Sequence, residues 1–183
     1  IRMEGFPRIR IFPQKGPPKK ILRRANNCSF LKMDVSELYN IAEIKVSYVP
    51  NLKKADRHKI TGSRAAYDVL KVAFIEEMHL FESFKVLLLN NSNDVLGIYT
   101  ASNGGMTGTL VDVRMILSRA LVANATAMIL AHNHPSGGLR PSRADEEITT
   151  KIKNAAKYLD INVLDHIIVT ADAFYSFADE GKL

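Results

Sequence analysis

Two histidines one residue apart, followed by a serine and an aspartate, are the residues of this chain best suited to chemistry. Seven residues separate His134 from Ser142, and two more separate Ser142 from Asp145. Neutral imidazole and carboxylate groups suit a divalent ion such as zinc, and three protein ligands leave one coordination position open for water. An isolated His-x-His occurs by chance, but the full spacing predicts a metal site of His132, His134 and Asp145 that supports hydrolysis.

The elements around these residues should bring them together. The apolar run from Ala127 to Ala131 predicts a buried strand, and its period of two places His132 and His134 on one face. Beyond the loop, Ser142 precedes a pattern with helical spacing, so Asp145 falls in the first turn of a helix. The alternative for this serine and aspartate is a capping box, which only closes the N-terminus of the helix.

The spacing resembles the JAMM pattern of the JAB/MPN metalloproteins, and the surrounding residues resemble the RadC family within that superfamily. The resemblance extends from about Met33 to the C-terminus, and it is carried by the segments His132–Gly137, Pro141–Ser142, Asp165–Ile168, Tyr175–Phe177, Glu180–Gly181 and Gly104–Arg114. It implies Zn²⁺ as the cofactor, with His132, His134 and Asp145 as its ligands.

JAMM enzymes also use an upstream glutamate, at the start of a strand, as the general base. The candidates are Glu76, Glu77 and Glu82. The first two fall within a helical pattern, whereas Glu82 leads directly into the apolar strand Phe84–Leu89. We therefore select Glu82 as the predicted base; the alternative is a solvated carboxylate at the end of a strand.

Two further roles follow from the resemblance and from local context. The family position of Ser142 implies that its hydroxyl stabilises the oxyanion formed during attack on a carbonyl. Asp165 and His166 interrupt an apolar strand run, which predicts a pair of residues behind the ligands that orients one of them. A core histidine satisfied by ordinary hydrogen bonds is the alternative for His166.

The positive charge of the chain is concentrated at its N-terminus. Residues 1–32 hold nine basic side chains and one acidic side chain, a net charge of +8, while the whole chain carries +6. The remaining residues therefore carry −2, so the composition of the predicted catalytic domain does not favour phosphate binding. We expect residues 1–32 to be a disordered, proline-containing extension and residues 33–183 to be the RadC-like domain.

The basic extension has two interpretations. It could associate with DNA, or it could be a poorly structured extension outside the natural start of the protein. Full-length RadC proteins carry an N-terminal helix-hairpin-helix region, and nothing in this chain matches it. The single cysteine, Cys28, excludes an intramolecular disulfide, and no apolar run is long enough to span a membrane, so we expect a cytoplasmic protein.

The order of apolar patterns predicts a single α/β domain, a mixed central sheet flanked by helices. The resemblance further implies a cytidine-deaminase-like architecture. We expect strands at 43–49, 84–89, 95–101, 127–134 and 161–169, and helices beginning near 61–63, at 113–123, after 142, and briefly at 173–178. The glycine-containing loop after Ala101 is predicted either to lie near the metal at the edge of the substrate site or to be a simple connection between elements.

The leading functional hypothesis is a zinc metallohydrolase that cleaves peptide or isopeptide bonds with a zinc-activated water and a glutamate base. Its partner would be a peptide or protein substrate. The alternative is a DNA-repair accessory or DNA-binding protein without protease activity. Other zinc chemistries lack their signatures, because the chain contains no His-Glu-x-x-His and no Cys-x-x-Cys.

Overall fold

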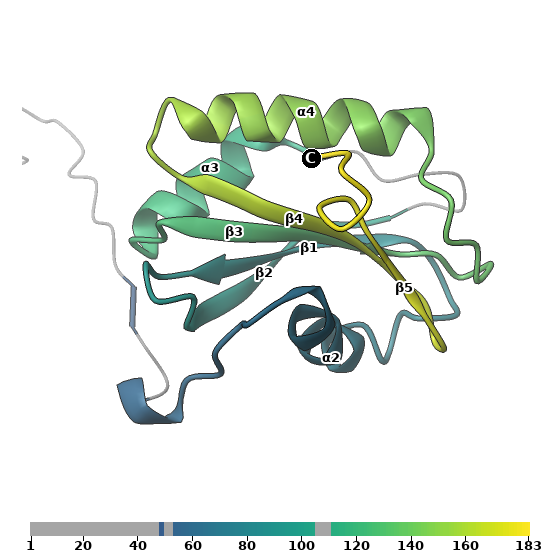
Figure 1. Ribbon diagram of the computed structural model, residues 1–183, viewed down its shortest axis with the longest axis horizontal. Coiled ribbons are helices and arrows are strands. Elements are labelled where there is room, and N and C mark those ends of the chain that lie inside the picture. The colour runs from purple at the N-terminus through teal and green to yellow at the C-terminus, as the bar shows by residue number, and fades with distance from the viewer. Residues whose placement is uncertain (1–47, 50–52, 105–110) are drawn as a thin grey trace, which may run out of the picture. The chain divides into compact units, whose positions relative to one another are not determined.

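A mixed sheet forms the centre of the protein (Figure 1). The computed structural model describes residues 48–49, 53–104 and 111–183. In this part of the chain the five strands are ordered β2-β1-β3-β4-β5. Their bounds are β1 Ser83–Leu89, β2 Val95–Asn103, β3 Ala127–Asn133, β4 Asn162–Val169 and β5 Phe174–Ser176. β3 and β4 are parallel, and the other neighbouring strands are antiparallel.

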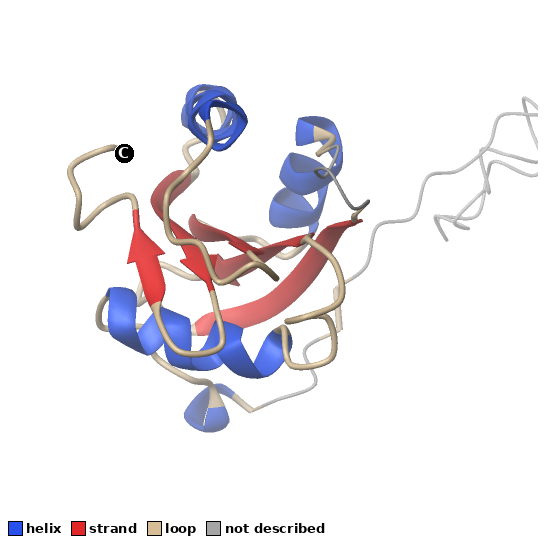
Figure 2. Ribbon diagram, turned by 90° about the vertical axis from the view of Figure 1, so that its right-hand side faces the viewer, coloured by secondary structure: helices blue, strands red, loops and turns tan. Residues whose placement is uncertain are grey.

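Helices cover both faces of this sheet (Figure 2). α2 (Ser63–Ala73) lies on one face, while α3 (Val113–Val122) and α4 (Arg143–Lys157) lie on the other; a short 3-10 helix, η2 (Lys54–Asp56), precedes α2. Alternate residues of β1 enter the two resulting cores: Leu87 and Leu89 pack on the α2 side, and Val86 and Leu88 on the α3/α4 side. The predicted α/β domain with a mixed sheet and flanking helices is thus confirmed.

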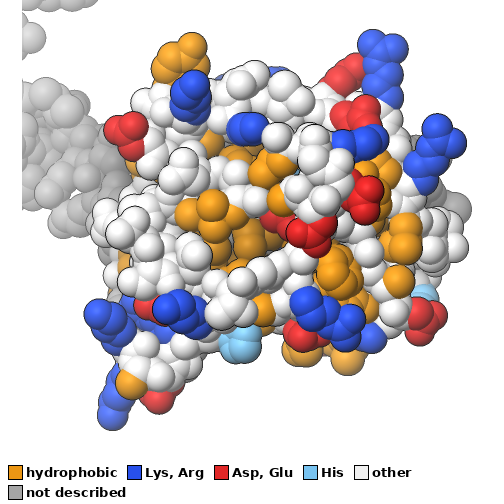
Figure 3. Space-filling model, in the orientation of Figure 1, with side chains coloured by type: hydrophobic (Ala, Val, Ile, Leu, Met, Phe, Trp, Pro, Cys, Tyr) orange, Lys and Arg blue, Asp and Glu red, His pale blue; other side chains and the backbone are white. Residues whose placement is uncertain are grey.

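The connection between β3 and β4 determines where the predicted ligands meet. Because these strands are parallel, the chain must return along the sheet between them, and α4 makes that return. The N-terminus of α4 therefore lies at the edge of the sheet where β3 ends. Its inner face buries Ile152 and Ala156 against the sheet, and charged side chains occupy its outer face at the top of Figure 3.

One predicted element is wrong and another lies mostly outside the described residues. The segment expected as a helix at 173–178 instead forms β5, because the Thr170 hydroxyl and backbone close a tight turn with Ala173 and return the chain along the edge of β4. The strand expected at 43–49 falls outside the described residues except for Tyr48 and Val49, which form no strand.

The remaining predictions concern Glu76 and Glu77, the N-terminal extension, the glycine-containing loop and membrane spans. α2 ends at Ala73, so Glu76 and Glu77 lie in the turns after the helix rather than within it. The extension 1–32 and residues 105–110 of the glycine-containing loop lie outside the described residues. Among the helices that are described, none has the length and apolar character needed to cross a membrane.

Candidate metal centre

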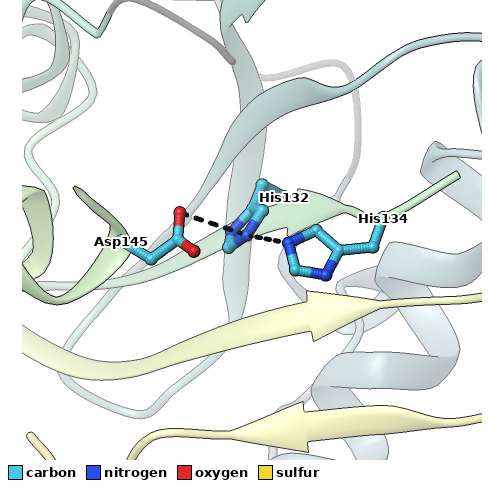
Figure 4. A group of neighbouring side chains, drawn as sticks. All are labelled: His132, His134 and Asp145. Carbon is cyan, nitrogen blue, oxygen red and sulfur yellow. Dashed lines mark hydrogen bonds and ion pairs between the residues drawn. The ribbon is translucent and has the colours of Figure 1, made fainter. Parts of the chain in front are cut away.

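The three predicted ligands meet where the end of β3 faces the first turn of α4 (Figure 4). Their ligand atoms all lie within 4.8 Å of one another. Nε2 of His132 is 3.0 Å from Nε2 of His134 and 3.4 Å from Oδ1 of Asp145. His132 is buried, whereas His134 and Asp145 are half-buried. The group could hold a metal ion, with one side toward solvent.

A chain of hydrogen bonds determines which nitrogen of His132 carries a proton. The Thr149 hydroxyl donates to the carbonyl oxygen of Asp145 at 2.5 Å, so its oxygen must accept from Nδ1 of His166, also at 2.5 Å. Nε2 of His166 is then unprotonated and accepts from Nδ1 of His132 at 2.8 Å. Nε2 of His132 therefore presents a lone pair to the group.

The loop after β3 has the same effect on His134. Its Nδ1 donates to the carbonyl oxygen of Gly138 at 2.6 Å, which leaves Nε2 unprotonated in the neutral ring. Gly137, with φ of 77°, adopts the left-handed conformation that turns the loop back over this imidazole. A backbone carbonyl thus orients the second ligand.

These hydrogen bonds leave three acceptor atoms facing one another, one from each predicted ligand. Two imidazole lone pairs and a carboxylate oxygen face one another at short distances, and no proton donor lies between them when both rings are neutral. Three such atoms repel each other unless a cation is placed among them. The donor set and its second hydrogen bonds fit a divalent ion, since metal-bound histidines generally donate their other N–H to an oxygen or a similar acceptor.

Burial keeps the two inner histidines neutral. It lowers the pKa of His132 to about 4; the Asp145 carboxylate opposes the shift and His134 adds to it. Burial, with smaller contributions from His132 and His134, also places the pKa of His166 well below its usual range. Phe84 stacks beside His132 and Phe177 beside His166, which excludes water from both rings. Neutral rings are the form that binds metal.

Ser142 is the N-cap of α4 and forms a capping box with Asp145. Its hydroxyl donates to Oδ2 of Asp145 at 2.6 Å and accepts from the Asp145 amide at 3.2 Å, while its own amide also donates to Oδ2 at 2.7 Å. These bonds occupy Oδ2 and leave Oδ1 toward His132. The capping box that was the alternative for this pair is therefore present. It places the hydroxyl of Ser142 beside the carboxylate of Asp145.

The glutamate candidates separate onto two sides of the sheet. Glu77 forms an ion pair with Lys85 at 3.0 Å, and alternation along β1 places Lys85 on the α2 side. Phe84 opposes and stacks on His132, so Glu82, two residues earlier, belongs to the α3/α4 side with the histidines. Of these two, Glu82, the residue directly before β1, is the one that the alternation assigns to the side of the predicted ligands.

Asp165 and His166 have different surroundings. His166 contacts the ligand His132, whereas Asp165 accepts hydrogen bonds from the Ser176 hydroxyl and the Ala178 amide and so holds the C-terminal segment. Sequence reasoning missed Thr149, which links His166 to the Asp145 backbone. Its spacing of four residues from Asp145, on the same helical face, is the signal that could have identified it.

Removing only the Thr149 hydroxyl should weaken metal binding. Thr149→Val keeps the shape but leaves the tautomers of His166 and His132 unspecified, so we expect metal affinity to fall by roughly 10- to 100-fold. Thr149→Ser restores the hydroxyl and should recover most of it. Competition with a chromophoric chelator measures both; equal affinity in Thr149→Val and the wild type would show that the relay does not prepare His132.

A family model and several relatives match this chain. The family model described as RadC-like JAB domain matches residues 60–182. A UPF0758 protein of Flavobacterium johnsoniae is 45% identical over 177 residues, covering 89% of this chain and 76% of the relative. The UPF0758 protein YeeS of Escherichia coli is 41% identical, covering 72% of this chain and 92% of the relative.

A third relative is longer than the region it shares with this protein. The UPF0758 protein of Porphyromonas gingivalis is 41% identical over 136 residues, which are 74% of this chain and 59% of that protein. The family match covers most of the described residues, including the three ligands and the strands and helix that position them. The chain belongs to the RadC-like JAB domain family.

Proposed function

We propose that this protein is a zinc-dependent hydrolase that cleaves an amide bond, peptide or isopeptide, in a peptide or protein substrate. The observation that carries the proposal is that two imidazole lone pairs and one carboxylate oxygen face one another. Hydrogen bonds from Nδ1 of each imidazole keep its Nε2 unprotonated. Ligand atoms of a tetrahedral zinc ion lie about 3.3 Å apart. The two separations from His132, 3.0 and 3.4 Å, are near this value, and all three ligand atoms lie within 4.8 Å of one another.

The fourth position determines the reaction class. Three protein ligands are typical of catalytic rather than structural zinc, which is usually enclosed by four. A zinc ion held here would lower the pKa of a bound water to about 7, so that a nucleophile forms near neutral pH. Amide cleavage, in place of another hydrolysis, follows from the resemblance to JAMM enzymes and from family membership.

The roles of the remaining residues follow from their positions. Glu82, half-buried at the end of β1, would take the proton of the attacking water and deliver it to the leaving amine. The exposed hydroxyl of Ser142 donates to Asp145 in the resting state, and it would turn toward the substrate oxygen as negative charge develops there. His166 and Thr149 keep His132 in the tautomer that binds zinc.

Elemental analysis of the purified protein tests the metal site. We expect about one zinc per chain in the wild type and its loss in both His134→Ala and Asp145→Ala. His79→Ala is the matched control, because His79 is exposed and outside the group, and it should retain zinc. No uptake of zinc by the wild type, or retention in both ligand variants, would contradict the proposal.

Hydrolysis is tested with the same proteins on a peptide library and on isopeptide-linked conjugates. The zinc-loaded wild type should cleave members of one of these sets, the chelated protein should not, and added zinc should restore cleavage. Cleavage that persists in the chelated protein or in Asp145→Ala would separate the activity from this site.

A further inference from the structure

Asn133 lies between the two histidine ligands and points to the other side of β3. Its side chain is fully buried. Oδ1 accepts from the Ser83 amide at 2.8 Å and from the Ser83 hydroxyl at 3.3 Å. Nδ2 donates to the carbonyl oxygens of Phe81, Glu77 and Met78 at 2.9, 3.2 and 3.3 Å. One buried side-chain amide thus forms hydrogen bonds with backbone groups of the turns that precede β1.

Only an amide of this length and shape suits these partners. The three carbonyl oxygens need a donor, and the Ser83 amide needs an acceptor, so the oxygen and nitrogen of the side chain cannot be exchanged. A carboxylate would supply the acceptor but would repel the three carbonyls. An apolar side chain would remove the hydrogen bonds that Asn133 makes to the Ser83 amide and to the carbonyl oxygens of Phe81 and Met78, while the Glu77 carbonyl oxygen would keep its bond from the Leu80 amide. The chemistry of the pocket therefore specifies asparagine.

The hydrogen bonds enclose the proposed general base. Phe81 and Ser83, the residues directly before and after Glu82, are both bound by Asn133. The carbonyl oxygen of Glu82 itself accepts from the Gly104 amide at 2.8 Å. The backbone of Glu82 is consequently held on both sides, while its side chain remains half-buried and open to solvent.

The register of the sheet directs this held residue toward the ligands. β1 and β3 are antiparallel, and their pairing ends with Phe84 opposite His132. Extending this register by two residues, past the ends of both strands, would bring Glu82 beside His134. The side chains of His132 and His134 point to the α3/α4 side, and Asn133 points to the α2 side. The tripeptide His132-Asn133-His134 therefore supplies two predicted ligands on the α3/α4 side of the sheet. On the α2 side it supplies the hydrogen bonds of Asn133, which we call the clamp, to the residues before and after Glu82.

We infer that Asn133 is a positioning residue that holds Glu82 at the metal group, so that metal ligation and base placement are coupled through His132-Asn133-His134. The inference rests on the proposed function. It differs from a purely structural role, in which loss of Asn133 would loosen the fold without acting through Glu82. Catalysis is sensitive to such placement, because a displacement of about 1 Å can lower a rate by about 100-fold.

A double-mutant cycle with a matched control separates these roles. Asn133→Ala is combined with Glu82→Gln, and Asn90→Ala serves as the control. Asn90 is an asparagine at the opposite end of β1, and its side chain makes three hydrogen bonds, all within the β1–β2 turn. Zinc content, kcat, KM and amide exchange at Ser83 are measured for each protein.

We expect Asn133→Ala to retain one zinc per chain and to lose about 10- to 100-fold in kcat with KM within about twofold. In the Glu82→Gln background the same substitution should lower kcat by less than about threefold, because the residue through which it acts is already absent. Asn90→Ala should change kcat by less than about twofold. Exchange of the Ser83 amide should accelerate in Asn133→Ala and not in Asn90→Ala.

Four results would overturn the inference, and a fifth concerns the proposed function. Equal losses of kcat in both backgrounds, loss of zinc from Asn133→Ala, or an equal loss in Asn90→Ala would each show that Asn133 does not act through Glu82. Unchanged hydrogen exchange of the Ser83 amide in Asn133→Ala would show that Asn133 does not hold the backbone around Glu82. A wild type without zinc and without hydrolysis would overturn the proposed function, and the exchange measurement would still judge the clamp.

Discussion

Glu82→Gln is expected to lower kcat of the zinc-loaded protein by roughly 10² to 10⁴-fold while zinc remains bound. A general base contributes about this much to a hydrolysis, and glutamine preserves the size of the side chain but cannot accept the proton. Glu82 is outside the ligand group of His132, His134 and Asp145, so the metal should stay. Steady-state kinetics with elemental analysis on the same preparation measures both quantities.

Glu76→Gln provides the control for this substitution. Glu76 is an exposed glutamate in the turns before β1, and its replacement should leave kcat and zinc content unchanged. If Glu82→Gln keeps the activity of the wild type, the base must be sought elsewhere, and Glu77, paired with Lys85 on the far side of the sheet, is a poor replacement.

The metal-free protein is expected to lose several kcal/mol of stability as the pH falls from 6.5 toward 4. Burial lowers the pKa of His132 to about 4 in the folded state, against 6.5 for an ordinary histidine. Between these values the unfolded chain binds a proton that the folded chain excludes, so the free energy of unfolding decreases as the pH falls. For His132 alone the difference is worth about 3 kcal/mol, and His166 acts in the same direction.

Urea unfolding of the metal-free protein at several pH values between 7 and 5 measures this dependence. A slope of about 1 to 2.5 kcal/mol per pH unit near pH 5 corresponds to one or two excluded protons. His166→Asn should reduce the slope, whereas His58→Asn, at an exposed position, should not. A flat stability between pH 6.5 and 5 would mean that neither histidine is buried as described.

Local patterns were sufficient to predict the elements that bring His132, His134 and Asp145 together. The apolar run before His132 identified β3, and the period of two identified the shared face of the two histidines. Ser142 and the helical spacing after it identified the start of α4 and placed Asp145 in its first turn. These features depend on residues close together in sequence, so the sequence alone contains them.

Local patterns failed where long-range pairing decides the structure. The segment predicted as a helix at 173–178 became β5 because the unpaired edge of β4 offers hydrogen bonds that an isolated pattern does not reveal. The helical pattern before β1 was extended over Glu77, although that residue lies in a turn and pairs with Lys85 across the sheet from the ligands.

The sequence by itself determined the predicted ligand set, the strand and helix that carry it, and the family resemblance. Only the tertiary structure decided the hydrogen-bond partners that set the tautomers of His132 and His134, namely Thr149, His166 and Gly138, and the bonds of Asn133 to the residues on either side of Glu82. The physical reason is that ligand identity and spacing are properties of a short segment. Hydrogen-bond partners behind a site depend on strand register and on the α4 return between parallel strands, which bring distant segments together.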